Sequence, residues 1–380
     1  MNTDEKKVIS VCFVCPKAYG LFDPSVKTYY GGAEVDLYML ATELAKDPAF
    51  SVSFICADYG QPDEQVRENV RLLTGMDFRR NPVCSAWRLW RTLMKADAQF
   101  YMLETASPGV PLVYAFCRLH GRRFLYRTAS QMEFDGTYRA QHPVLGRLFY
   151  RVLCKADCVF IQNHQDQEQL RRAAGAESIV MPNGQRLTEP AGQEKTFILW
   201  VGRSAKVKHP ERFVELARRF PQESFVMVCR PATGDMEYEA LRRQAESTPN
   251  LRFYPDVDFF ELGRFFAAAK VFVNTSDAEG FPNTFIQAAA GGTAILSWRV
   301  NPDDFLTKYQ CGLACGGAME RLVKGLEFLL ERQRYSEIGQ NGLRYVREHH
   351  DISVLAERYK EILRGLAAGK NGRDSARRGG

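Results

Sequence analysis

The stretch SDAEGFPNTFIQAAAGGTAILSW, residues 276–298, places a turn and a helix start directly after an apolar run. That run, residues 271–275, predicts a buried strand, and Pro282 is expected at the first helical position, where its missing N–H costs nothing. The positive end of this helix suits a bound anion. Three backbone amides would lie there, those of Phe281, Asn283 and Thr284.

Two polar side chains, Glu279 and Gln287, flank this turn, and the combination indicates a sugar-nucleotide site. The segment resembles the signature of the retaining glycosyltransferases of family four: a Glu, a Gly-Phe-Gly or Gly-Phe-Pro turn, and a second Glu after seven intervening residues. The resemblance implies that Glu279 contacts the donor sugar, that the turn amides, from Gly280 onward, bind the diphosphate, and that Gln287 binds the ribose. Gln287 departs from the family's Glu, but an amide still donates and accepts hydrogen bonds. An ordinary strand–turn–helix unit is the alternative.

Length and composition bound the class of protein. A chain of 380 residues suggests about two domains, each large enough to bury its own core. The hydrophobic fraction of 45% and the charged fraction of 25% are typical of a soluble globular protein. The apolar run at residues 8–15 is too short for a secretory or membrane-spanning segment, so a cytoplasmic location is expected.

The ten cysteines do not predict a metal site. Cys12 and Cys15 lie three apart in a predicted strand, so they face opposite sides of the sheet. No cysteine pair has a second Cys or His pair at zinc spacing, and we expect buried free thiols.

The formal net charge of +6 is modest, and no nucleic-acid partner is expected. Basic residues nevertheless gather between residues 118 and 151, against only Glu133 and Asp135. They are Arg118, Arg122, Arg123, Arg127, Arg139, Arg147 and Arg151. A solvated face is one interpretation. The other is a surface for an anionic acceptor or for anionic lipid, which would give peripheral contact with the inner membrane face.

Apolar strand-like runs alternate with helical patterns almost throughout. In the first half the expected strands are residues 8–15, 51–57, 98–103, 123–128, 158–162 and 178–182. In the second half they are residues 197–201, 224–229, 251–254, 271–274 and 294–297. This alternation implies parallel sheets with crossover helices, that is, two doubly wound α/β domains.

A polar Pro/Gly stretch, residues 187–194, separates the halves. We expect an N-terminal, acceptor-side domain over residues 1–187 and a C-terminal, donor-binding domain over residues 195–350. The resemblance implies the GT-B architecture, in which two Rossmann-like domains face each other across a cleft and the donor lies at the strand ends of the second. It also implies a last helix, about residues 352–366, packing back on the first domain. Residues 367–380 are expected to form a disordered basic tail.

The stretch FILWVGRSAKVKH, residues 197–209, is the second match to the family, which ends a strand with Gly-Arg and places a Lys five residues after that Arg. Gly202, Arg203 and Lys208 fit these positions. Two cations there suit the charge that builds on a departing diphosphate, so Arg203, Lys208 and Glu279 are the candidate catalytic residues. Ordinary surface charge at the entrance of the next helix is the alternative.

Gly31 and Gly32 open a helical pattern near the start, where paired glycines let backbone approach a phosphate or sugar. A plain turn is equally compatible with them. In the family a GGAE-type turn at this place faces the donor across the cleft. The fingerprint G-x-G-x-x-G is absent from this turn, which argues against a Rossmann dehydrogenase.

The string Asp256-Val257-Asp258 is one with which other glycosyltransferases hold a divalent metal. Because it lies between a strand and a helical stretch, we expect Asp258 as an N-cap with Glu261 at the capping-box position. In the family the backbone of the residue matching Val257 contacts the base. Neither metal nor another cofactor is expected, although a metal ligand remains the alternative for these carboxylates.

The remaining matches lie in the first half. Residues 182–184, Pro-Asn-Gly, match a turn before the interdomain linker, and Asn-Gly tolerates left-handed backbone angles. The acceptor side departs from the family, because no His follows the strand at 123–128. Ser130, Gln131 and Glu133 are candidate contacts for the sugar or acceptor, with an ordinary loop as the alternative.

The sequence thus predicts a retaining hexosyltransferase of glycan or polysaccharide biosynthesis, with a UDP- or GDP-linked donor and a glycan or lipid-linked acceptor. No nucleophile is evident, so leaving-group stabilisation and positioning would carry the rate. A non-catalytic sugar-nucleotide-binding protein on the same scaffold is one alternative. Another GT-B enzyme, such as a sugar-nucleotide epimerase, is the second.

Overall fold

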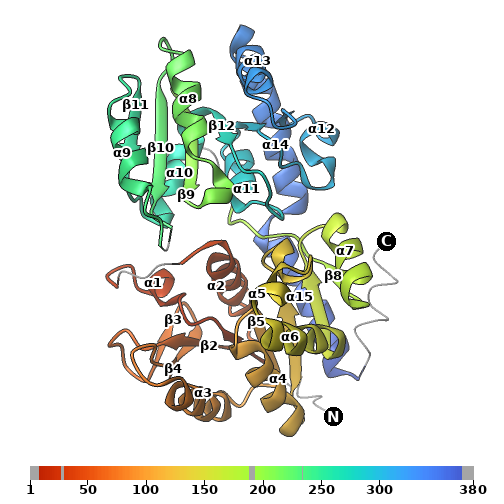
Figure 1. The fold of residues 1–380 in the computed structure, drawn as a ribbon. Coiled ribbons are helices and arrows are strands. Elements are labelled where there is room, and N and C mark those ends of the chain that lie inside the picture. Colours follow the sequence, from red (N-terminus) through yellow and green to blue (C-terminus); the bar gives the residue numbers. More distant parts are fainter. Residues whose placement is uncertain (1–7, 27–29, 188–192, 233, 370–380) are drawn as a thin grey trace. The chain divides into compact units, whose positions relative to one another are not determined.

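The computed structural model describes residues 8–26, 30–187, 193–232 and 234–369. The chain forms two compact α/β units (Figure 1). Unit 1 combines residues 1–186 with residues 352–380, and unit 2 comprises residues 187–351. Most of the expected linker and of the expected basic tail, residues 188–192 and 370–380, lies outside the described residues.

Unit 1 contains an eight-stranded sheet in the order β3-β4-β2-β1-β5-β6-β7-β8. The strands are β1 (Ile9–Val14), β2 (Phe50–Ala57), β3 (Glu64–Arg67), β4 (Val70–Met76), β5 (Phe100–Glu104), β6 (Arg123–Arg127), β7 (Cys158–Ile161) and β8 (Ile179–Val180). All neighbours are parallel except the hairpin β3–β4. The helices are α1 (Tyr19–Phe22), α2 (Gly32–Leu44), α3 (Pro82–Ala96), α4 (Gly109–Leu119), α5 (Thr137–Gln141), α6 (Pro143–Lys155), α7 (His164–Ala174) and α15 (Ile352–Ala367), with a 3-10 turn, η1 (Gln131–Glu133).

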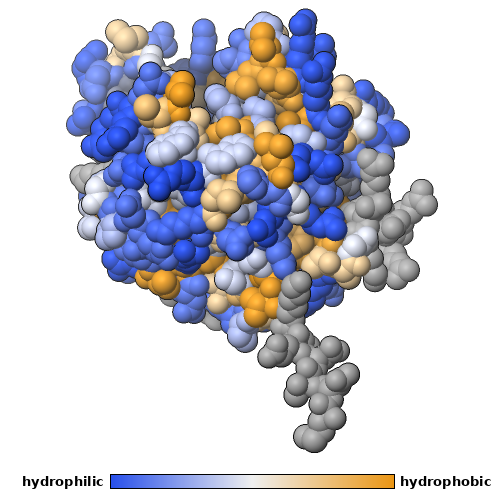
Figure 2. All heavy atoms as spheres, turned by 90° about the horizontal axis from the view of Figure 1, so that it is seen from below, coloured by the Kyte–Doolittle hydropathy of each residue, from blue (hydrophilic) through white to orange (hydrophobic). Residues whose placement is uncertain are grey.

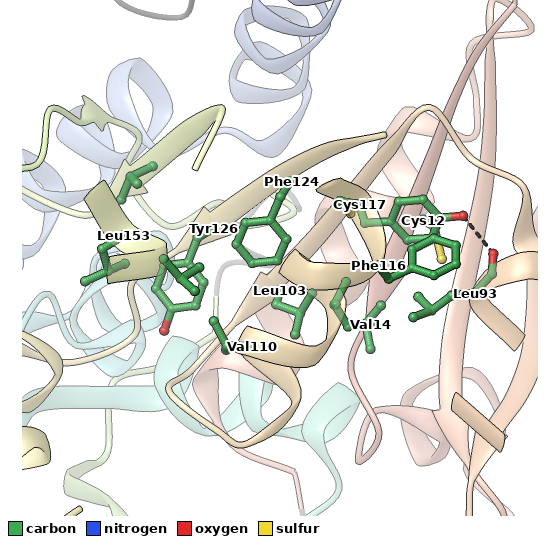
Figure 3. Packing of buried hydrophobic residues seen from close by; sticks show 14 of the residues in the cluster. Cys12, Val14, Leu93, Leu103, Val110, Phe116, Cys117, Phe124, Tyr126 and Leu153 are labelled. Carbon is green, nitrogen blue, oxygen red and sulfur yellow. Dashed lines mark hydrogen bonds between the residues drawn. The ribbon is translucent and has the colours of Figure 1, made fainter. Parts of the chain in front are cut away.

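Helices cover both faces of this sheet. On one face α3, α4 and α6 enclose an apolar core, in which Cys12 and Val14 of β1 lie near Leu93 of α3 and Phe116 of α4 (Figure 3). The Tyr101 hydroxyl within this core donates to the Leu93 carbonyl over 2.8 Å. Helices α2 and α15 pack together, and both contact the central strands. All ten cysteines are free, and only Cys84 and Cys154 are exposed, so the prediction of buried thiols holds for the other eight.

A buried polar cluster connects α15 to the sheet of unit 1 through Arg127 of β6. The guanidinium of Arg127 donates to Glu104 over 2.7 Å, to Asn183 over 2.6 Å and to the Tyr359 hydroxyl over 3.2 Å. Burying a charge is costly unless it is paired and hydrogen-bonded, as it is here. Arg127, which the sequence grouped with the surface basic residues, is 3% exposed, so that assignment was wrong for this residue.

The turn at residues 182–184 also differs from expectation. Neither Asn183 nor Gly184 takes a positive φ. Asn183 is buried and accepts from Arg127, and a Cβ on Gly184 would lie 2.4 Å from Cδ1 of Ile352. This Asn-Gly pair therefore serves packing and hydrogen bonding rather than a left-handed turn.

Unit 2 contains a six-stranded, wholly parallel sheet in the order β11-β10-β9-β12-β13-β14. Its strands are β9 (Phe197–Arg203), β10 (Phe225–Arg230), β11 (Leu251–Tyr254), β12 (Ala269–Asn274), β13 (Ala294–Ser297) and β14 (Gly312–Ala314). Its helices are α8 (Glu211–Arg219), α9 (Tyr238–Glu246), α10 (Phe259–Ala268), α11 (Asn283–Ala290), α12 (Phe305–Lys308), α13 (Met319–Leu330) and α14 (Arg334–His349). Short 3-10 turns are η2 (Lys206–Lys208), η3 (Pro302–Asp304) and η4 (Glu331–Gln333).

An apolar core lies on each face of the unit 2 sheet. The predicted fold class, two doubly wound parallel-sheet units, is therefore confirmed. In such sheets ligands bind outside the carboxyl ends of the strands, so the ends of β9 and β12 are where a site is expected.

Candidate functional site

The ends of two adjacent strands of unit 2 carry the polar residues of the candidate site. Strands β9 and β12 are parallel neighbours, and Arg203 and Asn274 are their last residues. The segment after β9 holds Lys208, and the turn after β12 holds Glu279. The fold thus brings together two motifs that lie about seventy residues apart in the sequence.

Lys208 and Glu279 form an ion pair, with Nζ 2.8 Å from Oε2. The other carboxylate oxygen of Glu279 accepts from the Asn274 amide over 2.8 Å and from the Ser276 hydroxyl over 2.6 Å. Burial alone would raise the pKa of Glu279, but Lys208, Ser276 and Asn274 together lower it below its usual value. Glu279 is therefore ionised and held in one orientation.

Local packing explains why Lys208 sits here. The indole N–H of Trp200 donates to the Thr275 hydroxyl over 2.8 Å, and that hydroxyl donates to the Lys208 carbonyl over 2.6 Å. A Cβ on Gly202 would lie 2.8 Å from the Trp200 ring and 3.3 Å from Cδ of Lys208. A glycine at this position lets the lysine stem pass close to β9. A direct contact of Gly202 with the donor stays a prediction.

Arg203 ends β9 with its side chain exposed. Within the part of the chain that the structure describes, its guanidinium makes no ion pair. Of the two cations of the motif, Lys208 therefore pairs with a carboxylate, whereas Arg203 remains available to an anion.

The turn after Glu279 is fixed by aromatic packing. The Phe281 ring is buried and lies 5.1 Å from the rings of Phe305 and His350. Pro282 is the N-cap of α11, with φ −64° and ψ 127°, so the helix begins at Asn283, one residue later than predicted. Its extended ψ keeps Pro282 outside the helix, although the proline still marks where the helix starts.

Gln287 lies on α11 one turn beyond Asn283 and Thr284, so these three side chains share a helix face. The Gln287 side chain is half-buried and has no hydrogen-bond partner among the described residues. An amide placed beside a helix N-terminus can both donate to and accept from a polyol. The structure thus places Gln287 close along the helix to the predicted diphosphate amides.

The string at residues 256–258 forms a loop after β11. Asp256 pairs with Arg230, whose guanidinium also donates to the Val257 carbonyl over 2.8 Å. Asp258 is the N-cap of α10, because its carboxylate accepts from the Phe260 amide over 2.9 Å. Glu261 does not complete a capping box and instead pairs with Arg264 at 2.8 Å, so that detail was wrong. In the described ranges no three His, Cys, Asp or Glu side chains come together to hold a metal.

A second charged cluster forms around Asp277, in the turn after β12, and was missed by sequence reasoning. The Asp277 carboxylate lies 2.7 Å from Nε2 of His209 and 2.9 Å from Arg212, and it accepts from the Trp298 indole over 3.1 Å. Burial would raise the pKa of Asp277, but Arg212 and His209 lower it overall. The signal in the sequence was the polar run at residues 274–277 directly after apolar residues.

The predicted residues of unit 1 are placed separately. Gly31 caps α2, its N–H donates to Glu34 over 2.7 Å, and Gly32 is the first helical residue. Gln131 donates to Asp166 over 2.6 Å, and the Ser130 hydroxyl accepts from the Met132 amide over 3.3 Å. These four residues are at least partly accessible, and their roles toward the donor or acceptor stay predictions.

Glu133 is only 4% exposed and faces inward. Its carboxylate accepts from the Tyr126 hydroxyl over 2.8 Å and from the amides of Ala106 and Ala129 over 3.3 Å. Burial raises the pKa of Glu133 to about 7, against these hydrogen bonds. Glu133 therefore links the loop after β5 to the loop after β6. Such a buried position does not favour contact with an acceptor hydroxyl.

The two α/β units have the GT-B fold, as their likeness to solved structures shows. Residues 185–344 match the model of "Glycosyl transferases group 1", and residues 31–184 match that of the "Glycosyl transferase 4-like domain". Together the two glycosyltransferase models match residues 31–344, which identifies the chain as a glycosyltransferase. Comparison with curated protein sequences finds no match.

Solved structures show the same fold. Sucrose-phosphate synthase from Thermosynechococcus elongatus is 17% identical with a TM-score of 0.76, covering 95% of this chain and 100% of that one. HepE of Anabaena, solved with UDP-glucose, is 14% identical with a TM-score of 0.74, covering 94% and 100%. The UDP-forming α,α-trehalose-phosphate synthase from Burkholderia xenovorans, solved with glucose-6-phosphate, is 13% identical with a TM-score of 0.70, covering 94% and 100%.

Proposed function

We propose that this glycosyltransferase moves a sugar from a nucleoside diphosphate donor to a glycan or lipid-linked acceptor, with retention at the anomeric carbon, as in family four. The observation that carries the proposal is the Lys208–Glu279 pair at the ends of β9 and β12. It occupies the two motif positions at which the family binds diphosphate and donor sugar. HepE, solved with UDP-glucose, and a similar E. coli structure, described as trehalose-6-phosphate bound with UDP-2-fluoro glucose, support a uridine donor. A guanosine donor is the alternative.

The geometry suggests how the leaving group is stabilised. An ammonium has three donors, and Glu279 takes one from Lys208, which leaves others for a phosphate oxygen. Arg203 and the positive end of α11 would add to this field. As the bond between the anomeric carbon and the diphosphate breaks, the departing oxygen gains negative charge. The acceptor oxygen then bonds to the anomeric carbon, and its proton passes to the departing phosphate.

We infer that the donor binds without metal. Asp256 is neutralised by Arg230 and Asp258 caps α10, so neither carboxylate is left to hold an ion. The two cations and the helix end supply the positive charge that a metal would otherwise bring. Nucleoside diphosphate binding should therefore persist in EDTA. If EDTA abolished binding and manganese restored it, this inference would be wrong.

Thermal-shift measurements with nucleoside diphosphates and their sugars test the proposal. A ligand at about a hundred times its dissociation constant should stabilise the protein by about 2.7 kcal/mol. No shift with any member of the panel would overturn the proposal. Gln287, standing where the family has Glu, favours one second candidate, a non-catalytic sugar-nucleotide-binding protein. Slow hydrolysis of a bound donor separates the two, because a pure binding protein leaves the donor intact.

A further inference from the structure

Three neighbouring helices of unit 1 lack acidic residues. Helices α3, α4 and α6 contain no Asp or Glu within 15, 11 and 13 residues, and they lie side by side along the sheet (Figure 1). Their basic residues are Arg88, Arg91, Lys95, Arg118, Arg147, Arg151 and Lys155. Helix α2, by contrast, carries the acids Glu34, Asp36 and Glu43 and no basic residue, whereas α15 carries Glu357 and Glu361 beside Arg358, Lys360 and Arg364. We name the face formed by the three acid-free helices the α3–α4–α6 surface.

The same surface exposes large apolar side chains. On α3, Leu89 and Leu93 face the core, whereas Val83 and Trp87, 75% and 62% exposed, follow a stripe that faces outward. The exposed apolar residues of the surface, including the loop before α3, are Phe78, Val83, Trp87, Met94, Leu119, Val144 and Leu148. The face of the protein seen in Figure 2 likewise has apolar patches set between hydrophilic ones. Clustered exposed apolar groups of this kind mark an interaction site.

Part of the positive charge on this surface is not neutralised. Arg88 pairs with Asp58 and Lys95 with Glu64, both at 2.8 Å. By contrast, five basic residues have no carboxylate partner anywhere in the described ranges: Arg91, Arg118, Arg147, Arg151 and Lys155. The guanidinium of Arg91 lies 4.8 Å from the centre of the Trp87 ring, so a cation and an indole are presented together.

This chemistry fits the surface of an anionic bilayer. Tryptophan, branched aliphatics and arginine on one helical face are typical of helices that lie in the headgroup region. A nucleic acid would not require the exposed Val and Leu, and a second copy would bring one basic surface against another. Within the described ranges, no helix has the length and apolarity to cross a membrane. We infer that the α3–α4–α6 surface binds peripherally to anionic lipid.

Co-sedimentation with vesicles tests the inference on the full-length protein. We expect binding to phosphatidylcholine vesicles that contain phosphatidylglycerol, little binding to phosphatidylcholine alone, and weaker binding as salt rises. Arg147→Glu with Arg151→Glu should weaken binding about thirtyfold or more, since each basic residue near such a surface contributes about fivefold. Trp87→Ser should weaken it about tenfold through lost apolar insertion.

Matched controls lie in unit 2. Arg218→Glu with Lys324→Glu makes the same charge change at exposed sites, and Phe328→Ser removes an exposed ring that also carries an arginine, Arg334, at 4.2 Å. Both controls should keep wild-type vesicle binding. The inference would be overturned if the wild-type protein did not bind anionic vesicles, or if the control variants lost binding equally. It would also be overturned if the wild-type protein were a dimer and the Arg147/Arg151 variant a monomer. Donor thermal shifts should be the same in every variant, which separates this outcome from failure of the proposed function.

Discussion

Gln287 is the residue at which the chain departs from its family, and its unpartnered amide allows a direct test. Gln287→Ala should weaken nucleoside diphosphate binding by roughly 0.5–1.5 kcal/mol, the net contribution of a neutral hydrogen bond. Gln287→Glu should be tolerated, because a carboxylate accepts from ribose hydroxyls. Calorimetric titration with the diphosphate measures both. An unchanged dissociation constant for a folded Ala variant would remove Gln287 from the site.

Arg203 and Lys208 are predicted to act mainly in the transition state. Their alanine variants should lower turnover more than donor binding, each on the order of 3 kcal/mol or about a hundredfold. Glu279→Ala should behave similarly, and it would also free Lys208 from its partner. Steady-state kinetics decides the matter, with Arg218→Ala, exposed on α8, as the control. Near-wild-type turnover in both cation variants would favour a binding protein.

Glu133 should make stability depend on pH. Its pKa of about 7 in the folded protein lies above the ordinary value of 4.5, so its stabilising contribution is complete below about pH 4.5 and is lost as pH rises through 7. Glu133→Gln removes this loss. The difference between the melting temperature of the variant and that of the wild type should therefore increase as pH rises from 5 to 8. Glu361→Gln, exposed on α15, is the control. A difference that does not vary with pH would show that Glu133 is not buried as described.

At this scale the sequence singled out Lys208 and Glu279 as site residues but predicted neither their ion pair nor its surroundings. Lys208 and Glu279 follow apolar strands at motif spacing, and their meeting follows from parallel strands ending at one edge. Asn274 and Ser276 were not predicted as partners of Glu279, because a short polar run after a strand is equally compatible with a turn. The capping box at Asp258 failed since Glu261 found a partner, Arg264, one turn along its own helix.

Helices α14 and α10 offer a matched pair of glycine tests at the scale of the element. A Cβ on Gly339 would lie 2.1 Å from the backbone oxygen of Gly292, so Gly339→Ala should push α14 outward and destabilise unit 2 by about 1–3 kcal/mol. Gly263 on α10 has no atom within 4 Å of such a Cβ. Gly263→Ala should therefore stabilise by roughly 0.5–1 kcal/mol. Urea titration measures both, and the idea fails if the two changes have the same sign.

Most strands were predictable, including the edge strands β8 and β11, whereas β3, β4 and β14 were missed. Buried parallel strands are continuous apolar runs, which is why β9 to β13 emerged from the sequence. The hairpin β3–β4 was missed because β3 is largely exposed and shows no apolar alternation. Its turn residues, Glu68 and Asn69, have φ values of 48° and 62° without a glycine to mark the reversal. Strand β14, of three residues, was too short to recognise.

For the whole molecule, ending the chain at Asp351 tests how the two units depend on α15. The truncation removes the Tyr359 hydroxyl from Arg127 and withdraws buried side chains such as Leu355 and Leu363 from unit 1. Unit 1 should lose its cooperative transition, whereas unit 2 keeps every residue of its sheet. Limited proteolysis should then leave a protected fragment of about residues 187–351. Continued protection of residues 1–186 would contradict this dependence.

The return of the chain into unit 1 also sets an order of events on the ribosome. Residues 187–351 leave the exit tunnel as one uninterrupted run, so unit 2 has all its parts before α15 emerges. Unit 1, although begun first, waits for its closing helix, and the apolar surface that α15 covers stays open to solvent until then. Domains usually complete folding in the order in which they are made. In this protein the N-terminal unit is the last to finish, and its unclosed face is the part of the nascent chain most in need of a chaperone.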